Sequence, residues 1–86
     1  MAAPLEYSVE LTQDELEEAA RYTIVIHWDR EDSIYIAEVP ELRGAKTHGD
    51  SPAEAAENAV IVAALWIRSA RMFNDSVPLP KALAVA

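Results

Sequence analysis

Polar and apolar residues follow different patterns along this chain, and each pattern predicts an element. Thr12 is a favourable N-cap, and Glu15 stands three positions after it, which is the spacing of a capping box. We therefore expect a short helix over Gln13–Arg21. The segments Tyr22–Trp28 and Ser33–Val39 are rich in β-branched and aromatic side chains, and a polar turn separates them. Together they predict a β-hairpin.

A long helix is predicted in the second half of the chain. Ser51 is a favourable N-cap, Pro52 suits the first helical position, and Glu54 has the spacing of the returning arm of a capping box. The helix is expected to run from Pro52 to about Phe73.

Two shorter segments flank this helix. Ala45–His48 precedes it and is expected to be extended. The later sequence SVPLP contains Pro78 and Pro80, which cannot continue a helix, and predicts either a short edge strand or an extended tail.

These elements predict an α+β fold. Its three-stranded antiparallel sheet, with a short C-terminal strand, would pack on one long helix. We divide the chain into an acidic N-terminal extension with a short helix (1–21), a main domain (22–80) and a C-terminal tail (81–86).

The long helix has apolar residues on two faces when it is drawn at about 100° per residue. The broad face is expected to pack on the sheet and consists of Ala55, Ala56, Ala59, Val60, Val62, Ala63, Trp66, Ile67, Ala70 and Phe73. The opposite face is polar and includes Arg68, but Ile61, Leu65 and Met72 also lie on it. Ile61 and Leu65 are one turn apart and form a single apolar knob. This knob indicates either contact with another chain or the scattered apolar residues of an ordinary surface.

Neither predicted strand of the hairpin has a wholly polar face. One helix covers only one side of a sheet, so the other side must meet the N-terminal helix, another subunit or a partner. The candidate interface residues from helix and strands are Ile61, Leu65, Arg68, Met72, Val25, Ile34 and Ile36.

Composition narrows the classes of function. The chain has 86 residues, of which 51% are hydrophobic, no cysteine, and a formal net charge of −8. This size predicts one domain, and the charge favours a basic protein partner over nucleic acid, unless it serves solubility alone. The apolar run Ala59–Ile67 is shorter than the roughly 20 residues of a membrane-spanning helix. The N-terminus lacks the features of a secretory signal, so we expect a cytoplasmic protein.

Candidates for chemistry are few. His27 and His48 lack the spacing of metal ligands, and no glycine-rich phosphate loop is present. We therefore expect no catalytic residue, no metal and no cofactor. The one alternative is a metal-dependent nuclease built from the carboxylates Asp29, Glu31 and Asp32 together with Glu38, Glu41 or Asp50.

The segment SIYIAEVPELRGAKTHGDSPAEAAENAVIVAALWI resembles the HicB-like antitoxin family, and the resemblance covers roughly Tyr22–Pro80. The residues that match the family pattern are Tyr35, Ala37, Val39, Pro40, Glu41, Leu42, Gly44, Thr47, Gly49, Asp50, Glu54, Ala55 and Asn58. The later VPLP, with Pro78 and Pro80, is similar to the segment that follows the helix in the family.

The resemblance implies a partial ribonuclease H-like fold and a role in a toxin–antitoxin system. Family members bind a small basic toxin of the HicA kind, an mRNA-cleaving ribonuclease, and hold it inactive. Ala45 stands where the family usually has cysteine. Many members continue into a DNA-binding domain, whereas only Lys81–Ala86 follow Pro80, so direct DNA binding is not expected. We expect a homo-oligomer, a dimer or larger, and an orphan self-assembling module without a toxin is the alternative.

Overall fold

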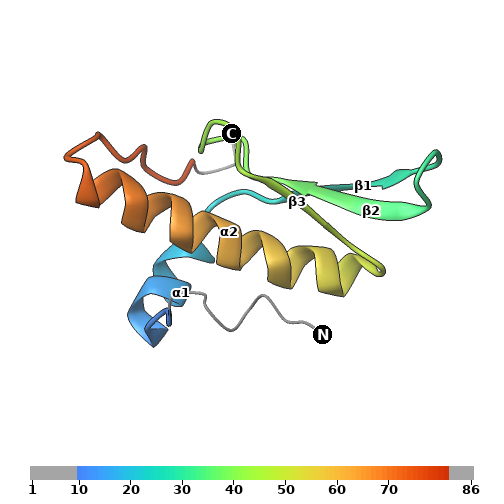
Figure 1. The fold of residues 1–86 in the computed structure, drawn as a ribbon, viewed down its shortest axis with the longest axis horizontal. Helices are drawn as coiled ribbons and strands as arrows, with labels where there is room; N and C mark the ends of the chain where they lie inside the picture. The colour runs from blue at the N-terminus through green and yellow to red at the C-terminus, as the bar shows by residue number, and fades with distance from the viewer. Residues whose placement is uncertain (1–9, 82–86) are drawn as a thin grey trace.

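Three antiparallel strands and two helices form the computed structural model, which describes residues 10–81 (Figure 1). In chain order the elements are α1 (Gln13–Ala19), β1 (Val25–Asp29), β2 (Ile34–Glu38), β3 (Lys46–Gly49) and α2 (Pro52–Met72). The strands lie in the order β1-β2-β3 in one sheet. The predicted α+β fold, with a three-stranded antiparallel sheet, one long helix and one short helix, is therefore confirmed.

The two helices begin where their caps are. The Thr12 hydroxyl accepts a hydrogen bond from the Glu15 amide, and the Glu15 carboxylate accepts one from the Thr12 amide, which completes the predicted capping box. At α2 the Ser51 hydroxyl accepts from the Glu54 amide at 3.1 Å. The Glu54 carboxylate, however, accepts from the amide of Asp50 at 2.6 Å, so it reaches one residue further back than the predicted box. The predicted first residues of both helices, Gln13 and Pro52, are therefore confirmed.

The register of the sheet decides which side chains share a face. Ile26 lies opposite Ala37, and Ala37 lies opposite Thr47. Because directly opposed residues point to the same side of a sheet, these three form a row on the side facing α2. The row of His27, Ile36 and His48 points to the other side.

Alanines bring α2 close to the sheet. Ala55, Ala59 and Ala63 are buried along one side of the helix, and Ala37 of β2 is completely buried. The largest fully buried side chains are Leu42 and Val39, at the turn between β2 and β3. The predicted alanine-centred packing face of α2 is therefore confirmed for these residues, and the core is built mainly from small side chains.

Phe73 is an exception to the predicted packing face. Its side chain is 70% exposed. The C-terminal end of α2 projects away from the strands, so the helix has left the sheet before it reaches Phe73 (Figure 1). Expecting Phe73 to pack on the sheet was wrong.

The segment after α2 is extended but forms no strand within residues 75–81. Val77 packs against the core, and two long-range hydrogen bonds also hold the segment to the domain. The Tyr22 hydroxyl donates to the Pro78 carbonyl at 2.5 Å, and the Lys81 amide donates to the Glu41 carboxylate at 2.9 Å. Pro78 and Pro80 have no amide hydrogen to give to a ladder. The predicted short strand at SVPLP is therefore wrong, and the alternative of an extended tail is correct.

The N-terminal helix α1 packs on α2 and not on the sheet, so that α2 lies between α1 and the sheet (Figure 1). Ala19 of α1 belongs to the same apolar core as the sheet residues. The helix ends at Ala19, two residues before the predicted end at Arg21. The first segment of the predicted domain division, 1–21, therefore contributes a helix to the core of the main domain.

Gly49, at the end of β3, marks the closest approach of strand and helix. A Cβ atom at this position would lie 2.5 Å from the backbone nitrogen of Ala55, which cannot move without shifting α2. Gly44 has open space around it but a φ of +82°, where non-glycine residues other than asparagine and aspartate are strained. The two glycines are therefore required for different reasons.

We predict that Gly49→Ala lowers the free energy of unfolding by about 1–3 kcal/mol because it overpacks the contact with α2. Urea unfolding followed by circular dichroism measures the change. Gly44 provides the control, since asparagine tolerates a positive φ: Gly44→Asn is expected to be more stable than Gly44→Ala, whereas Gly49→Asn is no better than Gly49→Ala. Equal stability of Gly49→Ala and the wild type would contradict the steric explanation.

Candidate interaction surfaces

The outer stripe of α2, which we define as Ile61, Leu65, Arg68 and Met72, lies on the side of the helix away from the sheet. The side chain of Ile61 is 43% exposed and that of Met72 is 70% exposed. Leu65 is half-buried. The structure therefore leaves an apolar knob at Ile61 and Leu65 accessible, and Met72 lies beyond it near the end of the helix.

Arg68 differs from the rest of the stripe because α1 binds it. Its Nε donates to the Glu15 carboxylate at 2.9 Å, and its Nη2 donates to the other oxygen of the same carboxylate. Nη2 also donates to the Glu10 carbonyl at 3.2 Å. This two-point geometry matches the planar guanidinium to the carboxylate, so Arg68 already has a partner within the chain.

A second arginine makes the same contact one turn later. Arg71 donates to both carboxylate oxygens of Glu18, at 3.0 and 2.7 Å. The two ion pairs join α1 to α2, and the side chains of Ala64 and Ile67 are buried beside them. Sequence reasoning missed this contact and placed no element on the outer side of α2.

The ion pairs change the titration of the two glutamates. Hydrogen bonds from Arg68 and from the Thr12 amide lower the pKa of Glu15 from its ordinary 4.5 to about 2. The hydrogen bond from Arg71 lowers the pKa of Glu18 as well. Both carboxylates are therefore held in the charged form that binds arginine.

The open sheet face is the second candidate surface, and we define it as Val25, Ile34, Ile36 and the two histidines His27 and His48. Val25 is 46% exposed, while Ile34 and Ile36 are half-buried. Among residues 10–81 neither helix covers this face, because α1 lies on the far side of α2 (Figure 1). The sequence left three possibilities for what covers this face: the N-terminal helix, another subunit or a partner. The structure shows that the N-terminal helix does not cover it.

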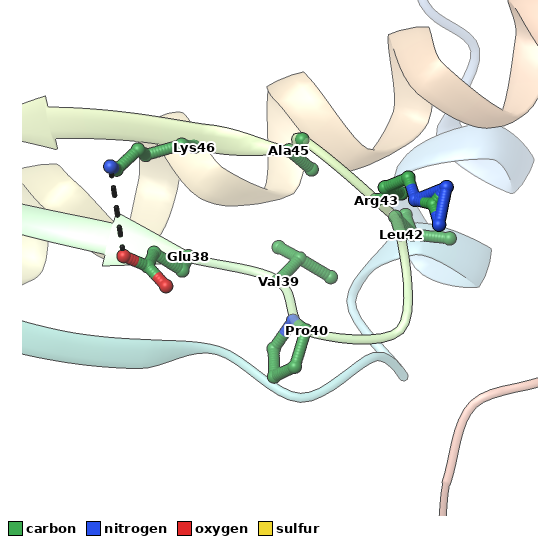
Figure 2. A pocket seen from close by; sticks show the side chains of 8 residues that line it. Glu38, Val39, Pro40, Leu42, Arg43, Ala45 and Lys46 are labelled. Carbon is green, nitrogen blue, oxygen red and sulfur yellow. Dashed lines mark ion pairs between the residues drawn. The ribbon is translucent and has the colours of Figure 1, made fainter.

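Between β2 and β3 the chain forms a shallow hollow (Figure 2). At one end of it Lys46 Nζ lies 3.9 Å from a carboxylate oxygen of Glu38. Val39, Leu42 and Ala45 from the turn are its buried side chains. The charges of Lys46 and Glu38 offset each other, and Arg43 is the remaining charged residue of the lining.

The carboxylates suggested for a nuclease are not gathered into a metal site. No group of three or more histidine, cysteine, aspartate or glutamate residues within 10–81 is placed to hold a metal ion. Glu41 instead ties parts of the backbone together, since its carboxylate accepts from the amide and hydroxyl of Thr23 and from the Lys81 amide. Partial burial opposes the ionisation of Glu41, but these hydrogen bonds outweigh it and lower the pKa.

Comparison of the sequence and structure with family models, curated proteins and solved structures found no match. Neither helix in residues 10–81 has the length and apolar character to cross a bilayer.

The Glu15–Arg68 pair predicts a defined dependence of stability on pH. Because the pKa of Glu15 is about 2 in the folded chain and 4.5 in the unfolded one, its contribution is complete above pH 4.5. It is lost as the pH falls from 4.5 toward 2, where the folded state also takes up the proton. Glu15→Gln removes the charge but keeps a residue that capping boxes accept.

We expect Glu15→Gln to be less stable than the wild type at pH 7, and this difference to shrink steadily between pH 4.5 and 2. Urea unfolding at a series of pH values measures it. Glu17→Gln is the control, because Glu17 accepts a hydrogen bond from Gln13 on α1 but forms no ion pair with α2. A difference between Glu15→Gln and wild type that stays constant down to pH 2 would contradict the assignment.

Proposed function

We propose that this chain is a HicB-like antitoxin, a non-catalytic protein that binds a small basic HicA-type ribonuclease and covers its active face. The sheet and long helix are compatible with the partial ribonuclease H-like fold that the resemblance implies. Inhibition would be stoichiometric, because the ribonuclease is blocked for as long as it stays bound. We place this activity in the cytoplasm, where the mRNA substrate of such a toxin is found.

The observation that carries the proposal is the acidic setting of the exposed knob on α2. Ile61 is 43% exposed, and the exposed Glu57 lies one turn before it on the same face. The basic residue nearest to the knob along the stripe, Arg68, is neutralised by Glu15. An apolar centre with the Glu57 carboxylate at its rim is complementary to a basic surface that has an apolar pocket.

The distribution of charge over the chain supports the same partner. The formal net charge is −8, with seven basic and fifteen acidic residues. Two of the seven basic residues, Arg68 and Arg71, are engaged by glutamates of α1. The remaining surface therefore attracts a basic protein at long range and repels the phosphates of nucleic acid.

The orphan module remains the alternative to this proposal, because the same exposed knob would also suit a partner unrelated to a ribonuclease. The nuclease alternative is less well supported. Asp29 ends β1, and Glu31 and Asp32 lie in the turn that follows, but no metal-binding group of three residues forms within residues 10–81.

The proposal is tested with the protein encoded by the neighbouring reading frame. We expect a small basic ribonuclease that co-purifies with this chain, and whose cleavage of RNA stops when the chain is added in equimolar amount. A neighbouring protein that cleaves RNA equally well in the presence of the chain would overturn the proposal. RNA cleavage by the chain alone, lost in Asp29→Asn, would instead support the nuclease.

The contact surface is tested with two matched variants. Ile61→Asp and Val25→Asp each place a charge at a similarly exposed position, 43% and 46% respectively, on opposite sides of the domain. We expect Ile61→Asp to weaken inhibition of the ribonuclease by at least tenfold, because a charge enters the apolar centre of the contact, and Val25→Asp to retain it. The reverse result would place the contact on the open sheet face.

A further inference from the structure

β1 and β3 are the outer strands of the sheet, and their free edges differ in backbone hydrogen bonding. The Val39 amide donates to the Ala45 carbonyl at 3.0 Å, so the backbone N–H of Val39 points toward β3. Since consecutive residues of a strand point their backbone groups to opposite neighbours, Ala37 also faces β3 and Ile36 faces β1. Ile36 is opposite His27, so His27 faces β2. The amides and carbonyls of Ile26 and Trp28 therefore point to the free edge of β1.

The free edge of β3 is partly covered by α2 and carries a charged residue. By the same alternation, the backbone groups of Lys46 and His48 point outward from β3. The Asn58 side chain on α2 donates to the His48 carbonyl at 2.8 Å, which occupies one of these groups. Lys46 adds a charge at the edge, and a lysine there opposes pairing with another strand.

The edge of β1 has no such protection in the described part of the chain. Among residues 10–81, none of the hydrogen bonds outside the strand ladder involves the backbone of Ile26 or Trp28. The strand, Val-Ile-His-Trp-Asp, contains neither proline nor lysine. Trp28 is 50% exposed and Val25 is 46% exposed, so the strand also carries accessible apolar surface. An edge of this kind is suited to accept a further strand.

We propose that the edge of β1 pairs with β1 of a second copy of this chain, antiparallel and around a two-fold axis at His27. The five-residue strands overlap completely only when His27 lies opposite His27 of the partner subunit. In this register Ile26 lies opposite Trp28 of the partner subunit, and these two residues exchange backbone hydrogen bonds. The two sheets then form one sheet of six strands.

Side chains on both faces are compatible with this register. On the side facing α2, Trp28 packs against Tyr35 with ring centroids 4.9 Å apart and planes at 61°. Ile26 of the partner subunit would extend this apolar cluster across the axis. On the open sheet face Val25 lies opposite Asp29 of the partner subunit, so no two acidic side chains face each other directly.

The dependence on salt distinguishes this contact from the binding of a basic toxin. Each copy has a net charge of −8, so two copies repel each other at long range, and salt screens the repulsion. Added salt should therefore strengthen the dimer, whereas it should weaken the complex between this acidic chain and a basic ribonuclease. The dimer and the proposed antitoxin function are thus independent, and each can fail without the other.

Single-cysteine variants test the register, because the chain contains no cysteine of its own. Opposed residues that do not exchange hydrogen bonds have Cα atoms about 4.5 Å apart, within the range that a disulfide spans. We expect His27→Cys to form a disulfide-linked dimer under mild oxidation at least tenfold faster than His48→Cys, which places cysteine on the same face at the other edge. Val25→Cys mixed with Asp29→Cys is expected to cross-link, and each of these two variants alone is not.

Sedimentation of the unmodified protein completes the test. A dimer that tightens as salt rises from about 0.05 to 0.5 M, together with the His27→Cys cross-link, supports the proposal. A monomer at all salt concentrations overturns it, as does a dimer in which His48→Cys cross-links and His27→Cys does not. If Val25→Cys cross-links with itself, the strands pair in another register and the two-fold axis at His27 is wrong.

Discussion

The close packing of α2 on the sheet sets the conditions for the rest of this structure. Alanines at positions 55, 59 and 63 face the completely buried Ala37, and Gly49 leaves no room for a Cβ atom against the first turn of the helix. Small side chains allow a short distance between the layers, but each of them removes little apolar surface from water. The large fully buried side chains, Leu42 and Val39, lie at one end of the sheet. In a domain of this size, additional buried contacts therefore add to the stability, and α1 supplies them on the other side of α2.

Most of the secondary structure follows from local rules that the sequence displays directly. Thr12 and Ser51 cap helices, the β-branched runs form the hairpin, and the alanines of α2 mark its buried side. Prediction failed where an outcome depends on how far one element extends past another. Phe73 has the right helical position for the core, but the sheet ends before the helix reaches it. The segment at Pro78 resembles a strand in composition, yet it is attached through Tyr22 and Glu41 without joining the ladder.

The candidate surfaces were predicted from helical and strand periodicity, which finds apolar residues on a polar face but does not show what covers them. Ile61 and Val25 are accessible, whereas Arg68 is bound by Glu15 within the chain. One signal for this contact was present in the sequence: glutamates at 15 and 18 have the same three-residue spacing as arginines at 68 and 71. Matching spacings on two helices allow both ion pairs to form in one relative position. Matching spacings predict ion pairs only when the two helices are already known to be neighbours. The periodicity within one helix does not show which other helix it contacts.

The position of α1 also determines how the two proposed contacts relate to each other. Because α1 binds both arginines of α2, Glu57 near Ile61 has no free arginine on that stripe, and under our proposal this surface would suit a basic protein better than a second acidic copy. The edge of β1 works by a different interaction, since backbone hydrogen bonds between strands do not depend on the net charge of either chain. The knob lies on the side of α2 opposite the buried alanines that face the sheet, whereas the edge belongs to the sheet itself. Pairing at the edge would therefore leave both knobs of a dimer accessible, so that one dimer presents two equivalent sites to a basic partner.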